Sequence, residues 1–165
     1  MGYKKYVKEA FQDNDGVSQD RLIKWRRQAA THRVENPTKP HRASSLGYTS
    51  KQGVFIIRQR VIRGGRQREQ FKAGRKSSNY GRRKVLSKSY QEVAENRVSE
   101  KHPNCEVIGS YDVGEDGAYK WFEVIVVDPD EPAVQADDEL QDAASRAGRS
   151  ERGLNSSGHR SRGLQ

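Results

Sequence analysis

The chain has 165 residues, of which 31 are Lys or Arg and 22 are Asp or Glu, and its net charge is +9 at pH 7. Leu, Ile, Val and Phe make up about 18% of the residues, and such a low share combined with a high net charge argues against a wholly globular fold. The chain has no apolar run of ~20 residues, no signal peptide and only one cysteine, so we expect one soluble cytoplasmic domain with appendages and no membrane partner.

Two helices are predicted before any strand. The first has apolar side chains at helical spacing, namely Tyr3, Val7, Ala10 and Phe11. The second is expected to begin at the N-cap Ser18 and to continue to about Arg33, before Pro37. Residues 37–48 are predicted to be an extended loop.

A buried strand is predicted at residues 54–63, with Arg58 and Arg60 on one face and Gln59 and Val61 on the other. The chain from 63 to 88 then has ten basic residues and few large apolar ones. A structureless loop of this length does not suit a compact domain, so we expect it to be an extension that lies on another molecule.

A helix and two more strands complete the predicted core. Ser89 and Glu92 form a capping box for a helix that ends before Pro103. Strands are predicted at residues 106–113 and 119–128, because Asp-Gly between such segments favours a hairpin. Trp121 and Phe122 are assigned to the core, since the second of these strands is the most apolar. A short helix is predicted at 137–149, and the tail after it has no core of its own.

These elements predict an α+β fold in which a small antiparallel sheet is packed with helices and long basic extensions are ordered by RNA. Residues 54–62 and 85–127 hold 18 of the 30 Leu, Ile, Val and Phe, which is enough for a small core. The other residues hold too few to offset an ordering entropy of ~1–2 kcal/mol per residue. The expected single domain, 1–165, has these parts: N-terminal helices (1–36), an extended basic loop (37–53), an α+β core (54–128) interrupted by a basic arm (63–88), and a C-terminal acidic segment with an Arg-Gly-Leu tail (129–165).

The positive charge is concentrated in residues 21–88, which contain 20 Lys and Arg and only two acidic residues, Glu35 and Glu69. A block of charge +18 repels itself unless a polyanion neutralises it. Arg outnumbers Lys in the block, which favours bidentate phosphate contacts and stacking on bases. Trp25, Tyr48 and Tyr80 are interleaved with it as candidates for stacking on unpaired bases. The block supplies these candidate RNA-binding residues: Arg26, Arg27, Arg33, Lys39, Tyr48, Arg58, Lys72 and Lys88.

No group of residues predicts an active site, a metal centre or a cofactor site. His102 and Cys105 are three residues apart, but a structural zinc ion needs four ligands and the chain has no second cysteine. A turn and a strand end explain the acidic residues that lie near one another, which are Glu115, Asp116, Glu123 and Asp128. We therefore expect no catalytic residue, no metal and no cofactor.

Short motifs are spread in order over nearly the whole chain: Pro37-Thr38-Lys39-Pro40, Leu46-Gly47-Tyr48, Lys51-Gln52-Gly53, residues 60–68 (RVIRGGRQR), 110–116 (SYDVGED) and 120–125 (KWFEVI), Asp128-Pro129, and two Arg-Gly-Leu triplets around Ser156-Ser157-Gly158. Together they resemble the archaeal and eukaryotic L-fifteen-e family of large-subunit ribosomal proteins, in its archaeal form. The resemblance implies a structural protein without enzymatic activity, and a mixed α/β domain with an antiparallel sheet and long extensions.

The resemblance also implies the partners: large-subunit ribosomal RNA and neighbouring ribosomal proteins, rather than a second copy of the chain. By position it implies RNA contacts at Arg42, Lys51, Gln52, Arg60, Arg63, Arg66, Arg68, Arg75, Lys76, Tyr80, Arg82, Arg83, Lys84, Arg160 and Arg162.

Two other functions compete with this interpretation. An RNA-processing enzyme with magnesium would need acidic residues beside the basic surface, whereas most acidic residues come after residue 110. A DNA-compacting architectural protein would share the basic block, and selectivity for RNA over duplex DNA in competition would separate it from a ribosomal protein.

Overall fold

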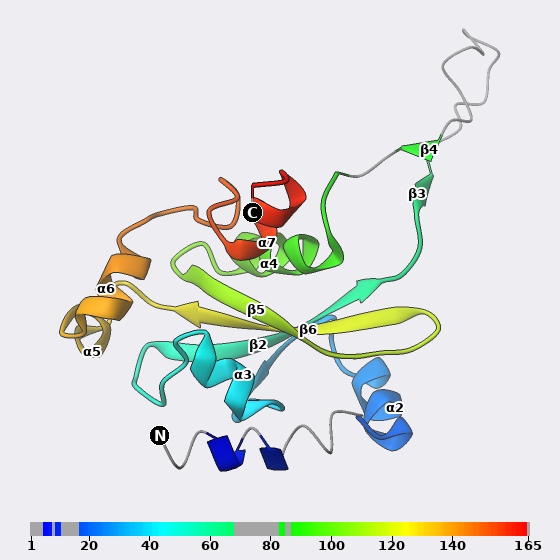
Figure 1. The fold of residues 1–165 in the computed structure, drawn as a ribbon, viewed down its shortest axis with the longest axis horizontal. Helices are drawn as coiled ribbons and strands as arrows, with labels where there is room; N and C mark the ends of the chain where they lie inside the picture. The colour runs from blue at the N-terminus through cyan, green and yellow to red at the C-terminus, as the bar shows by residue number, and fades with distance from the viewer. Residues whose placement is uncertain (1–4, 8, 11–16, 68–82, 85–86, 165) are drawn as a thin grey trace, which may run out of the picture.

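A four-stranded antiparallel sheet lies at the centre of the computed structural model, which describes residues 5–7, 9–10, 17–67, 83–84 and 87–164. The strands lie in the order β1 (Thr31–Val34), β2 (Val54–Ile62), β6 (Tyr119–Val127) and β5 (Glu106–Glu115). Two further strands, β3 (Arg66–Gln67) and β4 (Arg83–Lys84), pair with each other and stand away from this sheet beyond the end of β2 (Figure 1).

Helices cover both faces of the sheet. They are α2 (Gln19–Arg27), α3 (Pro40–Ser45), α4 (Tyr90–Lys101), α5 (Pro132–Gln135), α6 (Asp138–Ala144) and α7 (Ser156–Ser161), and residues 5–7 and 9–10 are also helical. α4 and α7 lie on one side of the sheet and α3 lies on the other, while α5 and α6 lie beyond one end of it (Figure 1). The predicted α+β class with a small antiparallel sheet is confirmed.

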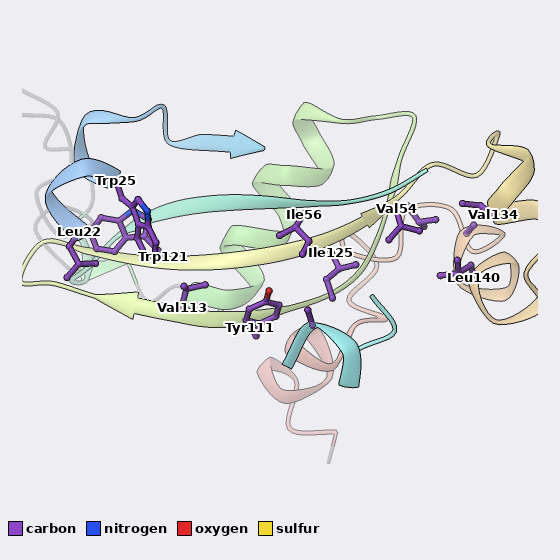
Figure 2. Packing of buried hydrophobic residues seen from close by; sticks show 13 residues of the cluster. Leu22, Trp25, Val54, Ile56, Tyr111, Val113, Trp121, Ile125, Val134 and Leu140 are labelled. Atoms are coloured by element: carbon purple, nitrogen blue, oxygen red, sulfur yellow. The ribbon is translucent and has the colours of Figure 1, made fainter. Parts of the chain in front are cut away.

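Apolar side chains lie on both faces of the sheet, because helices pack against each face. On one face, Trp121 and Ile125 belong to a cluster that extends from Leu22 of α2 to the side chains of α5 and α6 (Figure 2). On the other face, Phe122 and Val124 pack against α4. The prediction that Trp121 and Phe122 belong to the core is confirmed.

The elements predicted from strong local patterns are present. The strand expected at 54–63 is β2, and the helix that follows the capping box is α4. The Oγ of Ser89 accepts a hydrogen bond from the N–H of Glu92 at 3.1 Å. β5 and β6 form the expected hairpin, and the Oδ1 of Asp116 accepts from the N–H groups of Ala118 and Tyr119.

The prediction of a helix from Ser18 to Arg33 is wrong in its second half. α2 ends at Arg27, and the chain then forms β1, which pairs with β2 at the edge of the sheet. Pairing begins where the carbonyl of Ala30 accepts from the N–H of Arg60 at 2.7 Å. This tertiary contact outweighs the helix preference of the segment, which had only a thin apolar stripe.

The prediction of an extended loop at 37–48 is also wrong, because the segment contains α3. Pro40 occupies its first turn, where the missing N–H leaves no helical bond unmade. Ala43 is fully buried, and the side chain of Leu46 packs against the same cluster as Trp121. Burial of this short apolar face holds a helix of six residues, which local preference alone does not stabilise.

The basic arm predicted at 63–88 contains the β3–β4 pair, in which Arg66 lies opposite Lys84. A short antiparallel ladder is therefore present where the sequence predicted none. Residues 68–82, 85 and 86 of the predicted arm lie outside the described residues, as do Tyr3 and Phe11 of the first predicted helix.

The C-terminal tail, which was predicted to have no core of its own, is folded onto α4 through α7. The side chains of Asn155 and Ser157 are buried and donate hydrogen bonds to the buried carboxylate of Glu95, at 3.1 and 2.5 Å. The short helix expected at 137–149 is α6, with Asp137 as its N-cap, but it ends at Ala144 and not at 149. Polar contacts hold this part of the chain against α4. Such contacts leave no periodic apolar pattern in the sequence, so the sequence did not predict them.

Candidate nucleic-acid interface

Three arginines from two separate segments meet at the turn between β5 and β6. The Nε of Arg26, on α2, donates to the Oδ2 of Asp116 at 2.6 Å. The Nη1 of Arg63, just after β2, donates to the backbone carbonyl of Asp116 at 2.6 Å. Arg60 of β2 donates from Nη1 to the carbonyl of Arg26 at 2.7 Å, and its guanidinium lies 4.7 Å from the centre of the Tyr119 ring. We call Arg26, Arg60, Arg63 and Asp116 the turn cluster.

Acidic side chains surround the turn cluster, although they are distant from the basic block in sequence. Glu115 lies 3.8 Å from the Nη1 of Arg63 and 2.6 Å from the Nζ of Lys120. Asp112 lies 3.9 Å from the same Lys120 ammonium group. The fold therefore brings part of the acidic half of the chain against the basic block, an arrangement that charge counts along the sequence did not predict.

The surroundings of Glu115 and Asp116 favour the ionised form of both carboxylates. A hydrogen bond from Lys120 lowers the pKa of Glu115. Burial acts to raise the pKa of Asp116, but the N–H groups of Tyr119 and Ala118 and the guanidinium of Arg26 outweigh it and hold this pKa below its usual value. Glu115 and Asp116 thus stay negatively charged beside their basic partners.

Arg58, a predicted RNA contact, lies in the interior. Its side chain is 8% exposed, its Nη2 donates to the Oε1 of Glu123 at 3.3 Å, and its guanidinium lies 3.9 Å from the centre of the Trp25 ring. Burial lowers the pKa of Arg58, against the opposing effect of Glu123. Trp25 itself is 6% exposed and packs against Trp121 with ring centroids 5.9 Å apart, so it presents no face for a base. The alternation that placed Arg58 on one face of β2 was right, but that face is covered.

Other predicted residues lie at the surface with a partner from the chain itself. The guanidinium of Arg33 lies 4.7 Å from the centre of the Phe55 ring. Lys51 forms a 2.5 Å ion pair with Asp137, and Lys88 lies 3.8 Å from Glu92. Arg162 donates to the carbonyls of Gly153 and Gly158.

The remaining predicted residues divide into four groups. Exposed residues whose side chains form no hydrogen bond or ion pair with another described residue are Arg27, Arg42, Gln52 and Arg160. Half-buried residues are Lys39 and Tyr48, the latter packed against the Trp121 cluster. Arg66, Arg83 and Lys84 lie on β3 and β4, and the following lie outside the described residues: Arg68, Lys72, Arg75, Lys76, Tyr80 and Arg82.

Two kinds of residue belong with this surface although the sequence did not predict them there. Arg21 and Lys24 are exposed on α2, beside the predicted Arg27. Asp116 was explained by turn chemistry alone, yet it also binds two arginines. The available signal for α2 was the spacing of its basic residues, whereas the second role of Asp116 depends on contacts across 53 and 90 positions of the chain.

The described residues form neither a candidate metal site nor a candidate membrane-spanning helix. No three His, Cys, Asp or Glu side chains among them are grouped so that they could hold a metal ion. Within the same residues, no helix has the length and apolar character that a membrane crossing requires.

Comparison with known proteins agrees with the motifs. The family model described as Ribosomal L15, of the L15e type, matches residues 2–165. The large ribosomal subunit protein eL15 of Methanospirillum hungatei is 43% identical, with 97% of this chain and 86% of the relative aligned. The proteins of the same name from Methanocorpusculum labreanum and Picrophilus torridus are 42% and 44% identical, and the alignments cover 96% and 90% of this chain and 85% and 77% of the relatives. The motifs, the matched family model and these relatives together show that the chain belongs to the ribosomal L15e family.

Proposed function

We propose that the chain is a structural constituent of the large ribosomal subunit, where it binds and stabilises ribosomal RNA. The observation that carries the proposal is the excess of 18 positive charges in residues 21–88, within a chain whose relatives are named large ribosomal subunit proteins. Lys and Arg neutralise phosphates and release condensed counterions, which supplies most of the affinity of such a block.

Surface residues of the basic block are the proposed RNA contacts. The exposed side chains of α2 and α3 and the turn cluster support this assignment among the described residues. The basic residues of 66–84 are assigned by sequence and by the family motifs. Arg58 and Trp25 are left out, because both side chains are buried.

The same proposal sets the location and the other partners. The protein acts in the cytoplasm as part of ribosomes, beside neighbouring ribosomal proteins, and not as a free homo-oligomer or at a membrane. The L15e family consists of structural ribosomal proteins, so an RNA-processing activity has no support. The acidic residues that such an enzyme would need at the basic surface are engaged with Arg26, Arg63 and Lys120.

A filter-binding titration of the full chain with archaeal large-subunit RNA tests the proposal. The logarithm of the affinity should fall linearly with the logarithm of salt concentration, by about 0.7 to 0.9 for each phosphate neutralised. Duplex DNA should compete poorly, and the protein should co-sediment with large subunits after a high-salt wash. An affinity that does not change with salt, or equal binding of duplex DNA, would contradict the proposal.

A further inference from the structure

We propose that Asp116 is a positioning residue for RNA binding, because its carboxylate fixes the guanidinium group of Arg26 beside that of Arg63, which donates to the backbone carbonyl of the same residue, so that the two form a phosphate-binding surface at the β5–β6 turn. The inference rests on the proposed function, since the phosphates of RNA are the ligand. It assigns an acidic residue to the interface with a polyanion, which charge alone would not suggest.

The carboxylate of Asp116 is turned inward and its hydrogen bonds are satisfied. Its side chain is only 5% exposed. Oδ1 accepts from the N–H groups of Ala118 and Tyr119 at 2.7 and 2.6 Å, and Oδ2 accepts from Arg26. A buried carboxylate with three donors presents little negative charge to a ligand approaching from solvent.

Both arginines are partly exposed, and contacts with the described residues leave some of their N–H donors unused. The side chain of Arg26 is 47% exposed and that of Arg63 is 39% exposed. An arginine has five N–H donors, and each of these side chains donates one hydrogen bond to Asp116. Arg60 adds a third guanidinium, held by the carbonyl of Arg26 and by the Tyr119 ring. Fixing these side chains in advance lowers the entropy that RNA binding would otherwise cost.

Glu115 provides an opposite case at the adjacent position. Its side chain is 46% exposed, and it forms an ion pair with Lys120. An exposed carboxylate beside the arginines repels phosphate at short range. Asp116→Asn and Glu115→Gln therefore each remove one negative charge, and the two substituted positions are adjacent in the chain. Charge alone predicts tighter RNA binding for both variants, whereas positioning predicts opposite effects.

The experiment measures binding of the full chain and its variants to archaeal large-subunit RNA. Asp116→Asn retains an oxygen for the two N–H groups of the turn but loses the acceptor of Arg26, so we expect binding about tenfold weaker, as for the loss of one charge-assisted hydrogen bond. Glu115→Gln is expected to bind as tightly as the wild-type protein or more tightly. Mass spectrometry verifies that the new amide, which precedes Gly117, stays intact.

A double-mutant cycle distinguishes positioning from a purely structural role. If Asp116 acts through Arg26, then Asp116→Asn should have little further effect in the Arg26→Gln background. In the single variant, the Nε–H resonance of Arg26 in NMR spectra should move toward that of a solvent-exposed arginine.

Three results would overturn the inference while leaving the proposed function intact. They are tighter binding by Asp116→Asn, unchanged binding by Asp116→Asn, and an equal loss with and without Arg26. By contrast, wild-type binding that does not depend on salt would contradict the proposed function itself.

Discussion

The carboxylate of Glu123 joins three other segments of the chain inside the protein. It accepts hydrogen bonds from the N–H and hydroxyl of Thr38 at 2.9 and 2.5 Å, and from the hydroxyl of Tyr111 at 2.7 Å. Arg58 supplies the balancing charge. Because the Glu123 side chain is fully buried, its charge is tolerated only while these donors remain in place.

Glu123→Gln should therefore lower the free energy of unfolding by about 3–5 kcal/mol, since it leaves the buried charge of Arg58 without a partner. Urea unfolding followed by circular dichroism measures the change. Asp130→Asn is the matched control, because Asp130 is exposed and its substitution should change stability by less than about 0.5 kcal/mol. Equal midpoints for the two variants would show that the buried pair contributes no net stability.

Tyr111 predicts how stability changes at alkaline pH. Burial and the neighbouring Glu123 carboxylate raise the pKa of Tyr111 far above its usual value of about 10. The unfolded chain loses this proton near pH 10 while the folded chain keeps it, so the stabilising contribution of Tyr111 is complete below pH ~10 and is lost as pH rises further.

A spectrophotometric titration of phenolate tests this expectation. Of the seven tyrosines, Tyr111 should ionise only when the protein unfolds. Tyr111→Phe should remove that late step and weaken the decline in stability above pH ~10. A wild-type titration in which all tyrosines ionise before unfolding would contradict the assignment.

The limits of sequence reasoning are visible at Arg58 and Glu123. The alternation along β2 was predicted correctly, as was the apolar character of β6. The two residues lie directly opposite each other because β2 pairs with β6 in one particular register. No local interaction fixes that register across 65 positions of the chain. The sequence therefore suggested an RNA contact at Arg58 and an ordinary strand residue at Glu123, and it did not predict that the two form a buried ion pair.

At the scale of elements, the helices and strands that local interactions stabilise were the ones that the sequence predicted correctly. α4 has its own capping serine, and the β5–β6 hairpin has its own Asp-Gly turn. By contrast, β1 exists because β2 offers an edge, and α3 exists because Ala43 is buried. Such elements are determined by long-range contacts that a single sequence does not specify.

The position of the C-terminal helix α7 depends on a close contact at one residue, Gly158. Gly158 of α7 lies so close to Gly153 that an added Cβ would be 2.5 Å from the Gly153 Cα. Glu95 binds the same segment through Asn155 and Ser157. Close backbone contact therefore explains the glycine at position 158, whereas the left-handed backbone (φ 64°) explains the glycine at position 153.

Gly158→Ala should displace α7 from α4, because the contact is with backbone that has little room to move. We expect faster hydrogen exchange at residues 155–162 and a loss of about 1–3 kcal/mol in stability, while the sheet keeps its protection. Gly65→Ala is the control, since an added Cβ there has nothing within 4 Å and the backbone is not in the left-handed region. Unchanged exchange at 155–162 would show that the two glycines do not hold the segment.

At the scale of the whole molecule, the fold neutralises part of its own charge. Lys51 pairs with Asp137, and the arginines of the turn cluster meet Asp116 and Glu115. These contacts join the basic block to the acidic C-terminal half, which the sequence presents as separate regions of opposite sign. The basic residues of 66–84 have no acidic residue among them in sequence except Glu69, so we expect another molecule to balance their charge.

Hydrogen exchange with and without large-subunit RNA tests this division of the molecule. Amides of β2, β5 and β6 should be protected in both states, because they pair in a sheet that is buried on two faces. The sequence predicts rapid exchange at residues 63–88 in the free protein, since few apolar side chains are available there to offset ordering entropy. Protection of 63–88 should appear when RNA is added and should disappear as salt displaces the RNA. Strong protection of this segment in the free protein would mean that the chain balances the charge of the arm by itself, and the physical basis for an RNA partner at these residues would be lost.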